Sequence, residues 1–130
     1  MTGLQSVTRK ESAVDCQRSV GFAPASLAAI RVPVLVFAAG TDTVGLPAEM
    51  ESGYLMDSLP AETSRYVEIG DATHFSFMQL CKPGAIALIE EETPGDGIVC
   101  EAGGERDRAA IHRQVADAII AFLAEALPPE

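Results

Sequence analysis

The most distinctive hydrophobic pattern in the chain is a continuous apolar run, Val32 to Ala39, that ends at Gly40. Such a run of β-branched and aliphatic residues is typical of a strand buried on both faces of a sheet. Pro33 lacks the N–H that a β-ladder needs, so we expect it at the first residue of this strand. Ser64 to Ile69 predicts a second, shorter strand, and its alternation of apolar and polar residues is typical of a sheet edge.

Helical patterns precede and separate the two predicted strands. A single helical turn is expected after Pro24. Pro47 stands at a first helical position, and Glu49 and Glu51 lie in the first turn. This segment therefore predicts a helix that runs to about Leu59 and ends at Pro60.

Two further patterns follow the second strand. Residues 83–104 predict a short helix and then an open, mobile loop from Pro94 to Gly104, because glycines and acidic residues accumulate there. Apolar residues three and four positions apart predict a long helix from about Asp107 to Ala126. The order strand, helix, strand, helix with short loops is the α/β pattern, and it predicts parallel strands.

The N-terminal segment shows no such periodicity. Residues 1–19 hold only scattered apolar side chains among charges, so we expect a poorly structured arm. Met1 to Arg18 also lacks the basic, apolar and small-residue succession of a secretory signal, which predicts a cytoplasmic location by default.

Length and charge restrict the classes of function. At 130 residues the chain can bury one core. Nineteen Asp and Glu against nine Lys and Arg give a formal charge of −10, which would repel phosphate groups and argues against nucleic acids and anionic membranes as partners. The longest apolar run is far shorter than the roughly 20 residues of a membrane-spanning helix.

Candidate chemistry lies in the two loops that follow the predicted strands. Asp42 comes three residues after the first strand, and His74 lies in the loop after the second. The carboxyl ends of parallel strands are where α/β proteins gather ligands and catalytic side chains. A carboxylate that accepts from Nδ1–H of an imidazole fixes the tautomer and leaves Nε2 as a general base, so we predict an Asp42–His74 pair.

Other interpretations of these residues stay open. Asp42 is also typical of a turn residue that caps its own backbone, and a single loop histidine such as His74 often faces solvent. His112 borders the apolar face of the last helix, where a histidine usually packs and hydrogen-bonds. A zinc site from His74, His112, Asp42 and a cysteine has no supporting ligand spacing, and Cys16, Cys81 and Cys100 form no Cys-x-x-Cys motif.

Three segments carry a family resemblance: GFAPASLAAIRVPVLVFAAGTDT, then His74-Phe75-Ser76-Phe77 with Cys81, then Cys100 with DRAAIH. Together they resemble bacterial predicted dienelactone hydrolases, members of the α/β-hydrolase superfamily, over about Val20 to Leu127. The resemblance implies that residues 20–130 are a partial α/β-hydrolase domain, the C-terminal portion of that fold, with a short parallel sheet flanked by helices. It also implies Asp42 as the catalytic acid and His74 as the base. A small-molecule ester or lactone would be the substrate, with no cofactor and no metal.

The nucleophile of such an enzyme is not found in this sequence. The family places it before the acid, on a Gly-x-Ser-x-Gly or Gly-x-Cys-x-Gly elbow, and neither motif occurs. Four residues are candidates by type alone, none with the required flanking glycines: Ser26, Ser52, Ser76 and Cys16. We therefore expect a hydrolase that takes its nucleophile from elsewhere, or else a non-catalytic binding or assembly module derived from one.

Two structural expectations accompany this resemblance. Because the family is often exported, a bridge between Cys81 and Cys100 is expected, and it would indicate a periplasmic or secreted protein; the alternative is two free thiols in a reducing cytosol. A two-stranded sheet leaves an edge and an apolar face uncovered, so we also expect a homo-oligomer or a complementary hydrolase half as partner.

Overall fold

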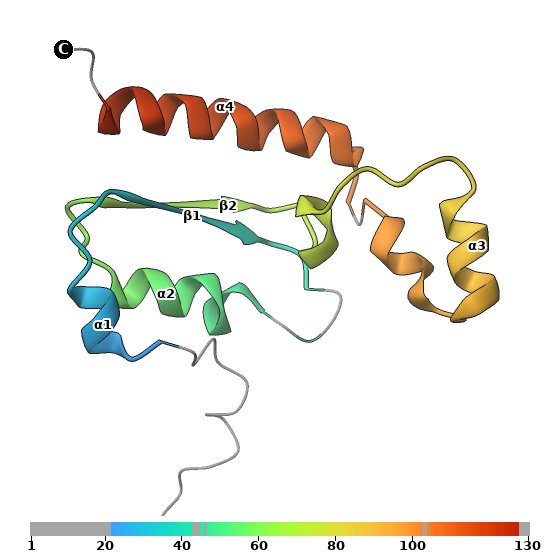
Figure 1. The fold of residues 1–130 in the computed structure, drawn as a ribbon, viewed down its shortest axis with the longest axis horizontal. Helices are drawn as coiled ribbons and strands as arrows, with labels where there is room; N and C mark the ends of the chain where they lie inside the picture. Colours follow the sequence, from blue (N-terminus) through green and yellow to red (C-terminus); the bar gives the residue numbers. More distant parts are fainter. Residues whose placement is uncertain (1–21, 43–44, 46, 103, 128–130) are drawn as a thin grey trace, which may run out of the picture.

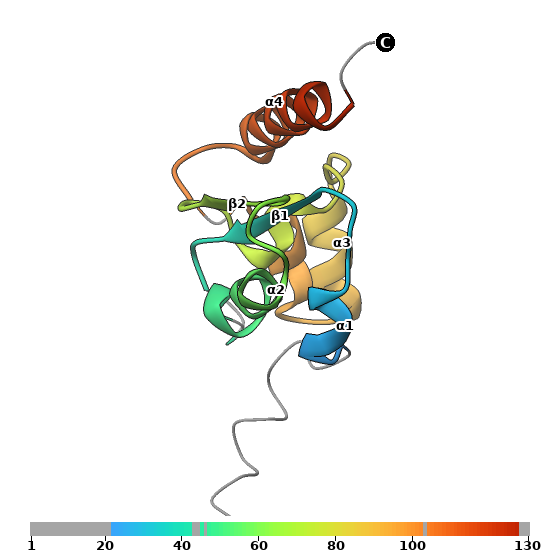
Figure 2. The same ribbon diagram turned by 90° about the vertical axis from the view of Figure 1, so that its left-hand side faces the viewer.

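The computed structural model describes residues 22–42, 45, 47–102 and 104–127. Residues 1–21 fall outside this part, so the predicted arm at 1–19 and Cys16 are not described. The described residues form a two-stranded sheet between helices (Figure 1). Two helices, α1 (Pro24–Ala28) and α2 (Ser52–Ser58), cover one face of it, and α4 (Arg108–Ala126) lies along the other (Figure 2).

The remaining elements complete the predicted order. The strands are β1 (Val34–Ala39) and β2 (Ser64–Ile69), the third α-helix is α3 (Ala85–Glu92), and three 3₁₀ turns are η2 (Ala48–Met50), η3 (His74–Phe77) and η4 (Asp96–Cys100). The expected α/β arrangement of strand, helix, strand and helix is therefore confirmed. In Figure 1, α3 and η4 lie beyond the carboxyl ends of both strands.

The strands pair in parallel, as predicted, from Val34 opposite Ser64 to Ala39 opposite Ile69. β1 begins at Val34 and not, as expected, at Pro33, because the backbone pairing starts with the Val34 N–H donating to the Thr63 carbonyl. The prediction that β1 is buried on both faces is wrong. Val36 and Ala38 are buried, but the other four residues are only half-buried, since the helix on the opposite face covers it incompletely.

Two apolar clusters form the core, one on each face of the sheet. The first joins β1 to α1 and α2 through Leu27, Val36 and Leu59. The second joins the sheet to α4 through Ile69, Ala72 and Ile111, with Phe37 and Val67 packed against them. β2 thus contributes Val67 and Ile69 to one face, while Tyr66 and Glu68 are exposed, in agreement with the edge-type alternation of its sequence.

Glycines let the two strand ends approach each other closely. A Cβ atom on Gly40 would lie 2.5 Å from the Cα of Gly70, closer than atoms can pack. The Thr41 N–H donates to the Ala72 carbonyl at 2.9 Å, and the Thr41 hydroxyl donates to the Gly70 carbonyl at 2.8 Å. Hydrogen bonds therefore hold the loops that follow β1 and β2 side by side.

The segment after β2 is more ordered than its glycine content predicted. The expected short helix is α3, but η4 occupies much of the expected open loop. The Glu90 carboxylate accepts from the N–H groups of Gly95 (2.9 Å) and Gly97 (2.7 Å), and these bonds hold the pKa of Glu90 below its ordinary value. A side-chain contact across several residues therefore orders this segment.

Cys81 and Cys100 form a disulfide, so the expected bridge is confirmed. Arg108 lies beside it and is only 5% exposed. Its guanidinium donates to the carbonyls of Gln79 (2.9 Å), Val99 (2.7 Å) and Glu101 (2.7 Å). The bridge and this buried cation together tie both ends of the α3–η4 segment to the start of α4.

α4 begins as predicted, because the Asp107 carboxylate caps it by accepting from the Ala110 N–H at 2.7 Å. Its expected apolar face is buried only near the start, at Ile111, with Val115 packed against the core. Farther along, Ile119, Ile120 and Leu123 are exposed, because the sheet beneath them is narrow. Across the described residues, we find no helix with the length and apolar character that spanning a bilayer requires.

Candidate functional site

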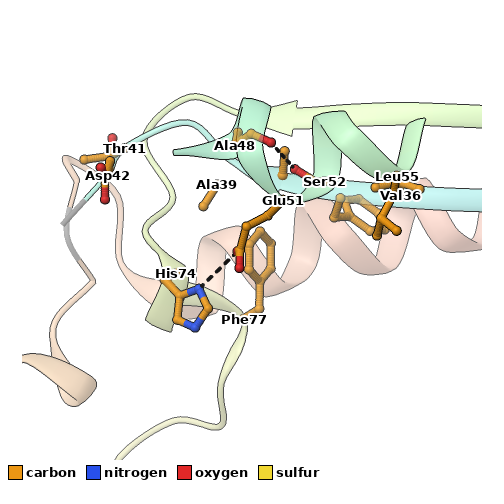
Figure 3. Close-up of a pocket in the computed structure, with 12 residues that line it drawn as sticks. Val36, Ala39, Thr41, Asp42, Ala48, Glu51, Ser52, Leu55, His74 and Phe77 are labelled. Atoms are coloured by element: carbon orange, nitrogen blue, oxygen red, sulfur yellow. Dashed lines mark hydrogen bonds and ion pairs between the residues drawn. The ribbon is translucent and has the colours of Figure 1, made fainter. Parts of the chain in front are cut away.

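A cavity of about 300 Å³ lies at the carboxyl end of β1, between α2 and η3 (Figure 3). Its lining comes from the end of β1, the loop after it, the start of α2 and the η3 turn: Val36, Phe37, Ala38, Ala39, Thr41, Asp42, Ala48, Glu51, Ser52, Leu55, His74 and Phe77. The two residues predicted to carry chemistry, Asp42 and His74, thus line one cavity. Its volume is at the lower end of the range for small-molecule sites.

His74 is held by the turn that it begins. Thr73 caps η3, and the Ser76 hydroxyl accepts from the Thr73 N–H at 2.8 Å. The same hydroxyl donates to the Ala102 carbonyl at 3.0 Å, which joins η3 to the segment before α4. Ser76 is completely buried, so this hydrogen-bonded turn presents His74 at a defined place beside the cavity.

His112 supports the same turn from α4. Its Nε2 lies 3.0 Å from the Ser76 carbonyl oxygen, within hydrogen-bond distance, and its side chain is half-buried. The prediction that His112 packs and hydrogen-bonds is therefore confirmed. His112 is not among the residues that line the cavity.

Asp42 combines two of the interpretations that its sequence allowed. Its Oδ1 accepts from the Gly45 N–H at 2.8 Å, which is the turn-capping role of an aspartate in a Gly-Thr-Asp-Thr loop. Asp42 is also exposed and lines the cavity with His74. The hydrogen bond from Gly45 holds one oxygen of this carboxylate.

A third titratable residue, Glu51, faces the cavity. Its Oε2 lies 4.0 Å from Nδ1 of His74, an ion-pair distance, and the two side chains are 38% and 50% exposed (Figure 3). From the sequence Glu51 was only an acidic residue in the first turn of a helix. No local motif places it opposite His74, because the contact depends on how α2 and η3 meet.

The nucleophile candidates lie in unsuitable places. Ser26 is on α1 and exposed, and Ser76 is buried in the hydrogen bonds of η3. Ser52 lines the cavity, but its hydroxyl donates to the Ala48 carbonyl of η2 at 3.3 Å (Figure 3). None of these three serines follows a strand on a sharp turn, which is how a hydrolase elbow exposes its nucleophile.

The zinc alternative brings no ligand set together. Cys81 and Cys100 are consumed in their disulfide. Within residues 22–127, apart from the positions not described, no group of three His, Cys, Asp or Glu side chains is placed to hold a metal ion.

The electrostatics of the cavity are acidic. Asp42 and Glu51 contribute carboxylates, and the lining residues that the structure describes include no lysine or arginine. Apolar side chains of β1 and α2 form the rest of its wall. This arrangement suits an uncharged ligand with a small apolar group better than an anion.

Comparisons with known proteins do not assign a family. No protein-family model, curated protein or solved structure matches the chain.

Proposed function

We propose that this chain carries the acid and the base of an α/β-hydrolase-like ester or lactone hydrolase. Asp42 would be the acid, and His74 the base, at the edge where parallel strands of α/β proteins collect catalytic groups. The observation that carries the proposal is their position: each follows one of two neighbouring parallel strands, and both line one cavity. The resemblance of the surrounding segments to dienelactone hydrolases supports the same roles.

In this reaction His74 moves protons. Its Nε2 accepts the proton of an attacking hydroxyl, thiol or water, whose electron pair forms a bond to the ester carbonyl carbon. The carbonyl electron pair shifts to oxygen and then returns, which breaks the bond to the leaving alkoxide. The imidazolium gives its proton to that alkoxide, and a carboxylate near Nδ1 stabilises the imidazolium in between.

A covalent nucleophile would come from another polypeptide or another part of a longer protein, because no elbow motif occurs in these residues. Acting on water alone, a positioned general base contributes typically about 10²–10⁴-fold. A low but histidine-dependent rate with an activated ester is therefore the expected property of the chain by itself.

A double-mutant cycle on p-nitrophenyl acetate hydrolysis tests the pairing of Asp42 and His74. The four proteins are the wild type, Asp42→Asn, His74→Gln and the double variant. Residues that act as a unit are non-additive. We expect each single variant to lose at least tenfold in rate, and the double variant to lose little more than His74→Gln.

His112→Gln is the matched control, since it replaces the other histidine and its amide can still donate to the Ser76 carbonyl. We expect this control to hydrolyse the ester like the wild type. Equal rates for His74→Gln and the wild type would overturn the proposal. If the rate loss of the double variant equals the product of the two single losses, Asp42 and His74 act independently. Asp42 would then not be the acid that supports this base.

A second candidate, an assembly module, is favoured by the position of the cavity along β1. Four consecutive residues, Val36 to Ala39, line it, although alternate residues of a strand face opposite sides of the sheet. The cavity therefore follows a strand edge, and an added strand from a second copy or from a complementary hydrolase half would pair there. The exposed apolar residues of α4 would be covered in the same assembly.

Sedimentation equilibrium at micromolar concentration tests this candidate. An assembly module should have at least twice the monomer mass. Leu35→Pro should reduce it to the monomer, because N–H groups alternate along a strand: those of Val34 and Gly40 donate to the β2 side, so that of Leu35 faces the unpaired edge. A monomer that unfolds in one two-state transition would contradict the assembly module. It would leave the hydrolase proposal intact, because hydrolysis by His74 does not require that the chain assemble.

A further inference from the structure

We propose that Glu51 is a positioning residue for His74, whose carboxylate selects the tautomer in which Nε2 is free to act as a base. This inference rests on the proposed function, because it names the group that orients the base of that site. It starts from one contact, between Oε2 of Glu51 and Nδ1 of His74. The ring nitrogen that faces a carboxylate keeps the proton, and the opposite nitrogen remains the acceptor.

The distance fits a contact that tightens during the reaction. At 4.0 Å the two atoms are within ion-pair reach and beyond a direct hydrogen bond. Catalytic contacts of this kind are often long without substrate and tighten in the complex. Both side chains are partly exposed, so they can close this gap by small rotations when a ligand excludes water.

The backbone of Glu51 is held more firmly than its side chain. Glu51 lies at the junction of η2 and α2, where its N–H donates to the Ala48 carbonyl (3.2 Å) and its carbonyl accepts from the Leu55 N–H (3.1 Å). Its φ and ψ of −116° and −91° depart from helical values. This break between two helical turns coincides with a side chain directed across to η3, where His74 lies (Figure 3).

Glu51 and Asp42 differ in the other contacts of their carboxylates. One oxygen of Asp42 caps the turn at Gly45, so Asp42 serves the backbone of its own loop as well as the cavity. Glu51 stands on a neighbouring helix and points from the opposite wall toward Nδ1. The two carboxylates thus line the cavity from different elements, and that of Glu51 lies within ion-pair distance of Nδ1 of His74.

The kinetic test compares Glu51→Ala with Glu49→Ala, a matched control that removes an acidic residue two positions away in η2, outside the cavity lining. With p-nitrophenyl acetate, we expect Glu51→Ala to lower kcat about tenfold with little change in KM. Glu51→Gln, which keeps an oxygen acceptor, should recover part of the loss, and Glu49→Ala should match the wild type. An unchanged kcat in Glu51→Ala, when His74→Gln does lose activity, would overturn this inference alone.

A spectroscopic test is independent of turnover. Nitrogen-15 NMR of the neutral imidazole reports which ring nitrogen carries the proton, and the His74→Gln spectrum assigns the signals. We expect the Nδ1–H tautomer of His74 to dominate in the wild type and in Glu49→Ala, and to decline in Glu51→Ala. The same tautomer ratio in all three proteins would overturn the positioning role. If His74→Gln hydrolyses like the wild type while the tautomer shifts, the hydrolase proposal fails and the orienting contact stands.

Discussion

The guanidinium of Arg106 binds the carboxylate of Asp71 through two hydrogen bonds, Nε to Oδ2 at 2.7 Å and Nη2 to Oδ1 at 2.5 Å. Asp71 begins the loop that carries His74, and Arg106 stands just before α4. Its Nη1 also donates to Gln114 on α4 at 2.7 Å. The pair therefore links the candidate catalytic loop to the helix that covers the sheet.

This pair predicts a specific dependence of stability on pH. The hydrogen bonds from Arg106 hold the pKa of Asp71 below its ordinary value of 3.8. The stabilisation is complete above that ordinary value. It is lost as the pH falls through the lower pKa of the folded state, because the unfolded chain takes up the proton first.

Urea unfolding at about pH 7 and about pH 3 checks this expectation in the wild type and in Asp71→Asn. The midpoint of the wild type should fall more between the two pH values than the midpoint of the variant. Glu90, whose pKa is lowered by the backbone donors of Gly95 and Gly97, remains in both proteins and shifts both alike. Identical shifts in the two proteins would show that the Asp71–Arg106 pair does not contribute.

The disulfide predicts a measurable difference between oxidised and reduced protein. It joins Cys81 to Cys100, which are 19 positions apart in the sequence. A crosslink over such a loop stabilises by about 3 kcal/mol on the chain-entropy estimate. The double variant Cys81→Ser/Cys100→Ser should lose about that free energy of unfolding, and reductant should bring the wild type to the same value. A wild type indifferent to reductant would argue against the bridge.

Buried Ser76 predicts a structural penalty, not a lost nucleophile. Ser76→Ala removes the acceptor for the Thr73 N–H and the donor to the Ala102 carbonyl. Leaving buried polar groups unpaired costs about 1–3 kcal/mol. We expect the free energy of unfolding to fall by that amount, while the exposed control Ser26→Ala changes it by less than about 0.5 kcal/mol. Equal stability of both variants would contradict the packing described for η3.

Substrate charge provides a test of the acidic cavity. Asp42 and Glu51 line it, and the described lining residues include no lysine or arginine, so a neutral ester should be preferred to an anionic one. Relative to their hydroxide rates, p-nitrophenyl acetate should react roughly fivefold faster than mono-p-nitrophenyl succinate, since like charges about 4 Å apart in water cost about 1 kcal/mol. Glu51→Gln should narrow this ratio and Glu49→Gln should not. A preference for the succinate would contradict the charge argument.

Parts of the fold with strong local signals could be predicted from the sequence. The apolar run before Gly40 predicted β1, and Asp107 predicted the start of α4, because each signal lies within a few consecutive residues. The burial of Arg108 could not be predicted, since its three carbonyl partners come from the disulfide-bonded segment before it. The hydrogen bonds by which Glu90 orders η4 could not be predicted either, because hydrophobic periodicity does not indicate such side-chain contacts.

The candidate site also contains residues that the sequence predicted and one that it did not. Asp42 and His74 were predicted to lie at one edge because both follow parallel strands, and both line the cavity there; their pairing stays a prediction. Glu51 reaches that edge from a helix, and its approach depends on the break between η2 and α2. The sequence predicted an acidic first turn there and no contact with His74.

The most direct test of the central claim is the rate of p-nitrophenyl acetate hydrolysis by the wild type beside His74→Gln, with the oligomeric mass recorded in the same buffer. The account predicts a rate at least tenfold lower for His74→Gln, at unchanged mass and stability. Equal rates for the two folded proteins would contradict it, because a general base that lines the cavity cannot be removed without cost to the reaction.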